Sequence, residues 1–507
     1  MLTRKKFSCL CPRLFFAFII AFFSFSIYSE NLEITLLYTN DIHDHIKPGY
    51  LGFGGMPYLS GFVQEIRKEK PNVLLVDAGD LLEKGDMVAD YTNGEIMYQA
   101  IEKIGYQVMT LGNHDFDQDI EHLCKLKQIS KSVEFVTTNF EEGLKACYKP
   151  WVVKKVGNFS VGFVGIVKLE GEDKEVAESA IPSVKKAIEE MKQQQNCHFF
   201  IALCHLGSQT CLNISKDLPE VSIFVSAHTH ELIKNAKKST ETGALVVQAG
   251  SYTQYVGYLD FVLDTETQKI IDYKDKVVEL NHNKIPMDKE LMDFIMARER
   301  EVCPIASKFL IENNKTISST QIAALSAQAM REYANADIAL CNPSLLIRSA
   351  LPATKLDYNA LYLTAGQRAK DLLQVTLSGK QIEQYLVNLV KYHWGRTAYA
   401  GMEAEYKSAF PMDKVAVKTN LDPNKKYKVI MAQREFEKRL LRSLQKDNEN
   451  IEEVKNTIQN CNFTFFDAVS KYVEEIREKG LSLDKYVNKM GIKNGKVEEY
   501  MEEDNNE

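Results

Sequence analysis

The sequence LGNHDFD, residues 111–117, places an amide, an imidazole and two carboxylates directly after a short apolar run. Asn113, His114, Asp115 and Asp117 all carry oxygen or nitrogen donors in their side chains. The same arrangement recurs through the first half of the chain, where apolar runs repeatedly end in Asp, Asn or His. The functional side chains are therefore expected at the ends of several strands rather than in one segment.

The apolar runs of the first half are short and rich in Val, Ile, Leu and Phe, which is typical of buried strands. They are ITLLYTND (34–41), NVLLVDAGD (72–80), QVMTLGNHD (107–115), VEFVTTNF (133–140), SVGFVGIV (160–167), FFIALCHLG (199–207), SIFVSAHTH (222–230) and ALVVQAGSY (244–252). Helical patterns over Tyr58–Lys70, Gly94–Ile104 and Ile181–Gln195 lie between them. Alternation of strands and helices predicts a layered α/β domain over residues 30–285.

A second domain is expected because 507 residues exceed what one hydrophobic core usually serves. Residues 288–310 have the pattern of a long polar helix, and we assign 286–306 as a helical linker. Residues 307–492 then form a smaller α+β unit, with predicted helices over 321–334 and 380–393 and predicted strands over 337–342 and 371–379. The acidic tail, 493–507, is expected to be disordered.

The N-terminal residues predict that the protein is exported from the cytoplasm. Arg4, Lys5 and Lys6 precede an uncharged run from Leu14 to Tyr28, which is typical of a signal peptide over residues 1–29. Ile27 and Tyr28 match the small residues of a signal-peptide cleavage site poorly, so an uncleaved N-terminal membrane anchor remains the alternative. The sequence has no second long apolar run, and we expect a secreted or periplasmic protein whose mature chain does not span a membrane.

Composition narrows the class of partner. Apolar residues make up 45% and charged residues 26% of the chain, as in a folded globular protein, and the formal net charge of −7 argues against a nucleic-acid polymer as partner. Of the 10 cysteines, Cys204 lies in a strand-like run and is expected to be a buried free thiol. In an oxidising compartment we expect one disulfide, with Cys197 or Cys211 as candidates.

The residues at the strand ends are metal ligands by type. They are Asp41 and His43 in YTNDIHDH, Asp80 in DAGD, Asn113 in LGNHDFD, His205 in CHLG, and His228 and His230 in AHTH. Carboxylate, amide and imidazole donors suit borderline divalent metals. The polar stretch after Tyr38 indicates that the chain has left the strand by Asp41, and Gly79 and Gly112 allow tight turns. This set exceeds one tetrahedral site and predicts two metals about 4 Å apart, bridged by a carboxylate such as Asp80.

The order of these motifs resembles that of the calcineurin-like metallophosphoesterases, and the larger arrangement resembles the secreted 5′-nucleotidase family, which includes bacterial periplasmic UDP-sugar hydrolases. The resemblance is strongest over residues 34–259. It implies one metal bound by Asp41, His43, Asp80 and His230, and a second bound by Asp80, Asn113, His205 and His228. The two ions would be Zn, Mn, Fe, Co or Mg. Family members often carry Gly where this chain has Ala227, which removes no ligand.

The resemblance also assigns roles at the opening motif. His114 would not bind metal but would point at the phosphate, and Asp117 would hold and polarise its imidazole. A hydroxide between the metals would attack the phosphorus of a small phosphorylated substrate, expected to be a nucleotide. Asp115 is interpreted as a local structural residue.

The second domain departs from the family. Where relatives carry an NGGGIR-like nucleotide loop, this chain has ALCNPSLLIRSAL (339–351), so Asn342 and Arg348 remain as expected substrate contacts while the glycines are replaced. Arg348 as a plain surface arginine is the alternative. The two aromatic residues that would stack on a base are not found in LTAGQRAKD (363–371) or VIMAQREFEKRLL (429–441), which is expected to weaken or redirect nucleotide recognition.

Other functions stay open on the sequence alone. The substrate could instead be a nucleotide sugar, a cyclic nucleotide or another phosphorylated or sulfonated small molecule. A non-enzymatic binding or surface protein on the same fold is the rival class, although a scaffold has no physical need for His114 and Asp117.

Overall fold

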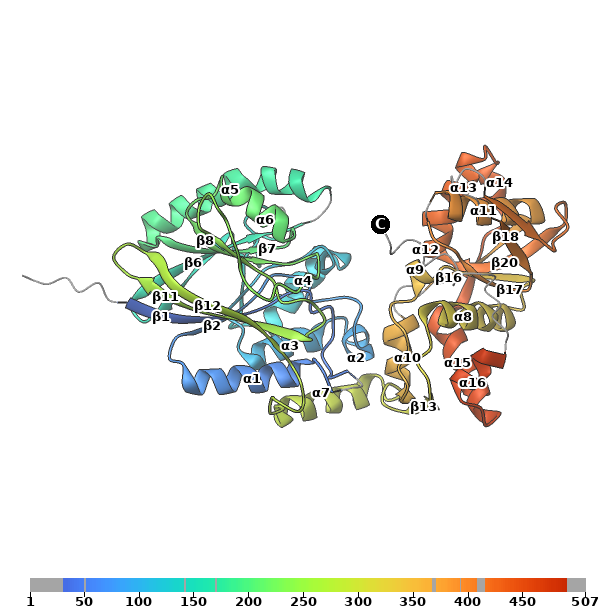
Figure 1. The fold of residues 1–507 in the computed structure, drawn as a ribbon, viewed down its shortest axis with the longest axis horizontal. Coiled ribbons are helices and arrows are strands. Elements are labelled where there is room, and N and C mark those ends of the chain that lie inside the picture. Colours follow the sequence, from blue (N-terminus) through green and yellow to red (C-terminus); the bar gives the residue numbers. More distant parts are fainter. Residues whose placement is uncertain are drawn as a thin grey trace, which may run out of the picture.

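The computed structural model describes residues 31–49, 52–140, 143–168, 171–366, 371–392, 394–407 and 415–489. The predicted signal peptide (1–29) and acidic tail (493–507) lie outside these residues. Figure 1 shows an N-terminal and a C-terminal domain joined along one side by helix α7 (Lys289–Val302). No helix in the described ranges is both long and apolar enough to cross a membrane.

The N-terminal domain is built on two six-stranded sheets. The first has the order β12-β11-β1-β2-β3-β4, and the second has the order β5-β6-β7-β8-β10-β9. The bounds of the first are β1 (Asn31–Thr39), β2 (Val73–Asp77), β3 (Val108–Met109), β4 (Glu134–Phe135), β11 (Tyr255–Asp264) and β12 (Lys269–Glu279). Those of the second are β5 (Trp151–Val156), β6 (Phe159–Ile166), β7 (Phe199–Cys204), β8 (Val221–Ser226), β9 (Lys237–Lys238) and β10 (Leu245–Val247).

The two sheets pack face to face with helices on both outer sides. Leu36 of β1 packs in a core shared with Phe163 and Ile201 of the second sheet, while its neighbour Leu37 packs with the helices. Helices α1 (Met56–Glu69) and α3 (Glu95–Ile104) cover the first sheet, and α5 (Asp173–Gln195) and α6 (Ser208–Ser215) cover the second (Figure 1). The predicted α/β layered sandwich is confirmed.

Parallel pairing places the important strand ends together. Strands β1, β2, β3 and β4 run parallel within the first sheet, and β6, β7, β8 and β10 run parallel within the second. Each apolar run predicted as a strand contains one. The antiparallel strands β5, β11 and β12 were not predicted, and β12 mixes polar and apolar residues without a regular period and has no buried side chain. Helix α5 begins at Asp173 rather than Ile181, and Pro182 lies inside it.

The connection between the domains differs from the expected long helix over 288–310. Helix α7 ends at Val302, and the chain then forms β13 (Phe309–Glu312), which pairs with β15 (Lys355–Asp357). The cause is Pro304, because the residue before a proline is disfavoured in helical conformation, and Cys303 has left it with φ −144°.

The C-terminal domain is the smaller α+β unit. Its five-stranded sheet has the order β17-β14-β20-β16-β21, with bounds β14 (Ile338–Cys341), β16 (Asp371–Ser378), β17 (Ala398–Ala400), β20 (Lys426–Ala432) and β21 (Gln459–Thr464). Helices α8 (Ser319–Ala334) and α11 (Gly379–Lys391) each begin with a capping box, in which Ser318 or Ser378 pairs with a glutamine three residues later. This local chemistry fixes where both helices start.

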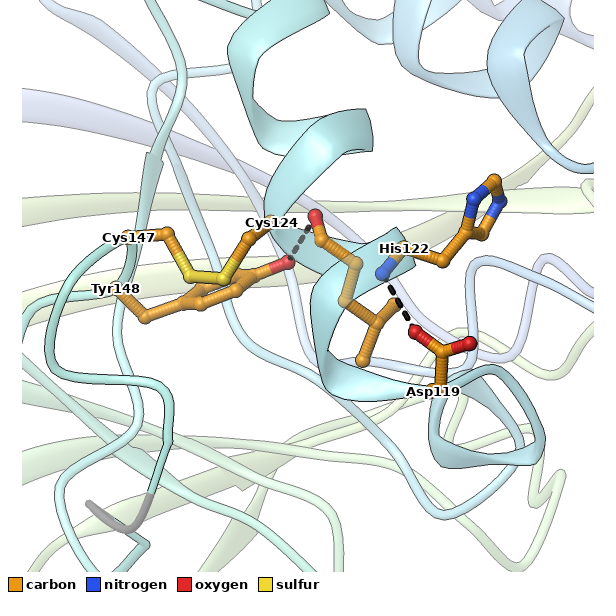
Figure 2. The surroundings of a disulfide bond; sticks show 6 residues. Asp119, His122, Cys124, Cys147 and Tyr148 are labelled. Carbon is orange, nitrogen blue, oxygen red and sulfur yellow. Dashed lines mark hydrogen bonds between the residues drawn. A yellow bond between two sulfur atoms is a disulfide. The ribbon is translucent and has the colours of Figure 1, made fainter.

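One disulfide joins Cys124 to Cys147, and it corrects the prediction that Cys197 or Cys211 would pair. Cys197, Cys204 and Cys211 are buried free thiols. Figure 2 shows the bond between helix α4 (Ile120–Ile129) and the loop that follows β4, with the Tyr148 hydroxyl donating to the Leu123 carbonyl (3.1 Å). The pairing depends on how this loop packs on α4, which cysteine spacing does not reveal.

Removing this disulfide should destabilise the fold. Cys124→Ser/Cys147→Ser frees a loop with a sequence separation of 23 residues, and closing such a loop stabilises a protein by about 3 kcal/mol. Urea unfolding without reductant measures the loss. The control is Cys461→Ser, which removes a free thiol. An unfolding midpoint of the parent that does not respond to reductant would contradict the stabilising role.

Candidate metal centre

The predicted ligand residues gather where strands of both sheets end. Asp41 and His43 follow β1, and Asp80 follows β2. The remaining residues follow β3, β7 and β8, and are Asn113, His205, His228 and His230. Two groups within this set are able to hold a metal ion, and in each group the ligand atoms lie within 4.8 Å of one another. The groups are Asp41, His43 and His230, and Asp80, His205 and His228.

The two groups meet at the Asp80 carboxylate. Asp80 Oδ2 lies 3.1 Å from His205 Nε2 in its own group and 3.5 Å from His43 Nε2 in the other. Within the other group, His43 Nε2 lies 3.1 Å from His230 Nε2, which is 3.4 Å from Asp41 Oδ1. A residue that touches both groups is placed where a bridging ligand would be.

Unsatisfied polar atoms test whether a cation fits here. His205 Nδ1 contacts the Ala78 carbonyl at 2.9 Å, and when the neutral imidazole donates its N–H there, Nε2 carries a lone pair that can bind a metal. His205 Nε2 and Asn113 Oδ1 are both buried and have no hydrogen-bonding partner among the described residues. Buried acceptors normally find a donor, so these two atoms, on loops that follow β3 and β7, fit ligands of a bound cation.

Charge favours a cation at the same place. Burial lowers the pKa of His205, but the neighbouring Asp80 carboxylate outweighs burial and raises the pKa to about 10. For Asp80 itself, burial opposes the charged form, and the His205 imidazole overcomes it and holds the pKa below its usual range. Asp80 therefore stabilises a positive charge at His205 Nε2, whether that charge is a proton on this nitrogen or a metal ion bound by the lone pair of the neutral imidazole.

The backbone of the ligand loops is in an uncommon conformation. Asp41, His43, Asp80, His228 and His230 have φ values of 51°, 50°, 60°, 78° and 56°. Such left-handed conformations are costly for residues with a Cβ and cluster at functional sites. Backbone hydrogen bonds from Asp41 N to the Gly79 carbonyl and from His43 N to the Asp80 carbonyl, both 2.9 Å, hold the first two loops together.

Two glycines make room for this packing. Gly79 has φ +97°, and a Cβ there would lie 2.6 Å from the Gly112 nitrogen. A Cβ on Gly112 would lie 2.2 Å from Asp80 Oδ1 and 2.5 Å from His205 Cε1. Any side chain at 112 would therefore push into the carboxylate that joins the two groups.

Asp115 is buried and ties two of the loops together. Its carboxylate accepts backbone N–H bonds from Asp80 (3.0 Å), Leu82 (3.0 Å) and Gly112 (2.7 Å). Burial, with the Asp80 charge adding to it, raises the pKa of Asp115 to about 7. This placement agrees with its interpretation as a structural residue.

His114 and Asp117 lie beside the centre. His114 Nδ1 is 3.0 Å from Asp117 Oδ2, and the His114 ring centroid is 5.3 Å from that of His43. The pKa of His114 is raised, because the Asp117 and Glu83 carboxylates outweigh the effect of burial. The structure therefore brings together the imidazole and the carboxylate that the sequence paired.

Two lysines border the centre and were missed by the sequence analysis. The Lys84 ammonium contacts His114 Nε2, and Lys168 Nζ lies 3.1 Å from His228 Nε2 and pairs with Asp173. Both follow strand ends, four residues after Asp80 and two after β6. Their position after a strand end is the signal in the sequence, but a lysine ammonium has no lone pair to bind a metal and does not stand out among ligand residues.

The two expected substrate contacts of the second domain lie apart from the ligands. Asn342 is fully buried, where its side chain accepts from Ser344 Oγ (2.6 Å) and its backbone N–H donates to Glu435 (2.8 Å). The hydrogen bonds of Asn342 to Ser344 and Glu435 therefore lie within its own domain. Arg348 reaches the other domain, where its Nη1 donates to the Lys84 carbonyl at 2.5 Å. It is therefore not a plain surface arginine.

Comparison with known proteins also divides the chain into an N-terminal and a C-terminal domain. Residues 34–232 match the family model of the calcineurin-like phosphoesterases, and residues 300–434 match that of the 5′-nucleotidase C-terminal domain. The predicted relationship to these families is confirmed.

Individual relatives are distant. An uncharacterized metallophosphoesterase, YunD of Bacillus subtilis, is 24% identical over 74% of this chain and 85% of its own length. The 5′-nucleotidase of Rattus norvegicus is 27% identical over 49% of this chain, and the match spans only 50% of that protein. The crystal structure of a 5′-nucleotidase precursor from Thermus thermophilus has a TM-score of 0.68 at 21% identity and covers 88% of this chain and 97% of that one, which shows the shared fold.

Asp115→Asn should weaken the N-terminal domain. An amide has one acceptor oxygen, so at least one of the three backbone donors would face an NH₂ group, and each unsatisfied buried donor costs about 1–3 kcal/mol. Urea unfolding measures the loss. Asp119→Asn is the matched control, because Asp119 caps α4 through His122 N (2.7 Å) and asparagine caps equally well. Equal stability of the two variants would contradict the role of Asp115.

Proposed function

The chain joins a calcineurin-like phosphoesterase domain to a 5′-nucleotidase C-terminal domain, and we propose that it is a metal-dependent hydrolase of small phosphoesters that accepts nucleotide 5′-phosphates. The observation that carries this proposal is the meeting of two ligand groups at Asp80, together with the buried His205 Nε2 and Asn113 Oδ1, which have no hydrogen-bonding partner among the described residues. One ion would take Asp41, His43, Asp80 and His230. The other would take Asp80, Asn113, His205 and His228.

Two bound divalent ions would supply Lewis-acid stabilisation of the phosphoryl charge and a lowered pKa for the attacking water. The residues of the chain would do the remaining work. Asp80 would be a ligand to both ions, and Asp117 orients His114 through Nδ1. With its raised pKa, His114 would offer a proton or a positive charge to the phosphoryl oxygens or the leaving group.

Substrate preference is the finer part of the proposal. The match to 5′-nucleotidases supports a nucleotide. Against a conventional nucleoside pocket, Asn342 is buried in its own domain and Arg348 contacts the Lys84 backbone. This arrangement favours recognition through the phosphate, and it leaves a nucleotide sugar, a cyclic nucleotide or a sulfonated molecule within the class to be screened.

Export is proposed together with this activity. The Cys124–Cys147 disulfide supports an oxidising compartment, because such bonds are rare in the cytosol. A secreted or periplasmic enzyme would meet phosphorylated molecules outside the cell or in the periplasm.

The direct test is hydrolysis by the purified protein with Mn, Zn, Co, Fe or Mg added. p-Nitrophenyl phosphate and a panel of nucleotides, nucleotide sugars and cyclic nucleotides would be the substrates. Metal-dependent turnover is expected, with elemental analysis finding two ions per chain. Absence of turnover from folded, metal-loaded protein would overturn the proposal. Folded protein that takes up no metal ion and shows no turnover would support the non-enzymatic alternative.

Asp80→Ala should lose both ions together, because its carboxylate touches both ligand groups. Elemental analysis after dialysis is the measurement. Asp217→Ala, which removes an exposed aspartate, is the control and should keep both ions. Retention of one ion at full occupancy in Asp80→Ala would contradict the bridging role.

His114→Ala should keep both ions and lose about 10²- to 10³-fold in kcat, as expected for a positioned acid or charge stabiliser. Steady-state kinetics and metal analysis of one preparation give both readouts. His198→Ala, which removes an exposed histidine, is the control and should keep the parent kcat and metal content. Loss of metal in His114→Ala would mean that His114 is a ligand.

A further inference from the structure

The segment that follows Asp80 connects the metal centre to the second domain. Residues 81–86 lead from Asp80 to the short helix α2 (Met87–Tyr91). Glu83 and Lys84 have φ values of 72° and 79°, so this turn holds two consecutive side-chain-bearing residues in the left-handed region. Backbone strain of this kind persists only where surrounding contacts impose it.

On one side, this turn contacts the centre. The Lys84 ammonium meets His114 Nε2, the ring nitrogen opposite the one that faces Asp117. The ammonium, which has three donors, lies beside the ring nitrogen from which His114 would offer a proton or positive charge to a substrate. An oxygen of a bound phosphoryl group that approached His114 would therefore also meet Lys84.

On the other side, the C-terminal domain holds the same segment by a series of hydrogen bonds. Arg348 Nη1 donates to the Lys84 carbonyl (2.5 Å). Asn359 Nδ2 donates to Asp86 Oδ1 (2.7 Å), its Oδ1 accepts from Met87 N (2.9 Å), and the Tyr362 hydroxyl donates to Asp90 Oδ2 (2.6 Å). Asn359 and Tyr362 belong to α10 (Tyr358–Ala365), which lies beside α2 where the domains meet (Figure 1).

Arg348 is itself fixed. It follows the short helix α9 (Pro343–Leu346), and its backbone N–H donates to the Thr364 carbonyl at the end of α10 (2.9 Å). The guanidinium thus connects a rigid part of the second domain to the peptide unit that carries the Lys84 side chain. It lies at the interface rather than among the ligand residues.

We propose that Lys84 is a substrate-binding residue that donates to the phosphoryl oxygens beside His114, and that Arg348 is a positioning residue that holds Lys84 through its carbonyl. This inference rests on the proposed phosphoester hydrolysis. A cation at the phosphoryl group stabilises negative charge that grows during transfer, and a fixed cation does so without reorganisation. The second domain then contributes to catalysis through the backbone of the first.

Lys84→Met tests the first part, since it keeps the length of the side chain and removes the charge. In the full, metal-loaded chain we expect kcat/KM for p-nitrophenyl phosphate to fall about 10- to 100-fold, and inhibition by inorganic phosphate to weaken about tenfold. Metal content and Tm should stay at the parent values. Lys84→Arg should recover part of the phosphate affinity. The matched control is Lys125→Met, which removes an exposed lysine paired with Glu121 on α4.

A double-mutant cycle tests the second part. If Arg348 acts through Lys84, Arg348→Ala should cost activity in the parent and almost nothing more in a Lys84→Met background. Multiplicative losses would overturn the positioning role and return Arg348 to an independent contact. Lys84→Met kinetics equal to those of Lys125→Met would overturn the binding role.

A readout without turnover separates this inference from the proposed function. Inorganic phosphate should raise the Tm of the metal-loaded parent, and the increase should shrink in Lys84→Met but not in Lys125→Met. If the parent binds phosphate in this way yet hydrolyses nothing, the proposed function fails while the role of Lys84 as an anion contact stands. If the parent hydrolyses substrate and both variants show the same phosphate-induced increase, only the inference fails.

Discussion

The buried Asp80 carboxylate is the constraint on which the rest of the site depends. A charge taken out of water requires compensation by opposite charge and by donors. The Asp80 carboxylate lies 3.1 Å from His205 Nε2 and accepts from the backbone N–H of His114 at 2.8 Å. The backbone N–H of Asp80 donates to the Asp115 carboxylate. His205 follows β7 of the second sheet, whereas His114 and Asp115 both follow β3 of the first sheet. The two sheets must therefore be packed in register before Asp80 is accommodated, which links the fold directly to the site.

This constraint also explains why strain concentrates here. A loop that directs donors from several strands toward one carboxylate cannot keep regular backbone geometry, and Asp41, His43 and His230 take left-handed φ values. Backbone hydrogen bonds, such as that from Tyr252 N to the Asp41 carbonyl (2.8 Å), offset part of the free energy that these left-handed conformations cost. Gly112 leaves the space beside Asp80 that any larger residue would fill. The strain is thus distributed over loops that a rigid sheet sandwich supports.

The sequence predicted what depends on local pattern and missed what depends on packing. Buried parallel strands appear as apolar runs, and His114 with Asp117 appears as a pair three residues apart within one motif. The end of α7 was missed, although Pro304 marks it. The Cys124–Cys147 bond, the buried place of Asn342 and the contact of Lys84 with His114 all join elements from separate parts of the chain. No spacing in one sequence encodes such contacts.

Arg348 shows how far a retained residue can differ from the role expected of it. A guanidinium fits phosphate and carboxylate, but it also donates well to a peptide carbonyl, and here it reaches the carbonyl of Lys84. Asn359 and Tyr362 hold the following residues of the same segment, so movement of the second domain must either break these bonds or move the Lys84 turn. The turn begins directly after Asp80. The position of the second domain and the geometry of the metal centre are therefore coupled through one short stretch of backbone.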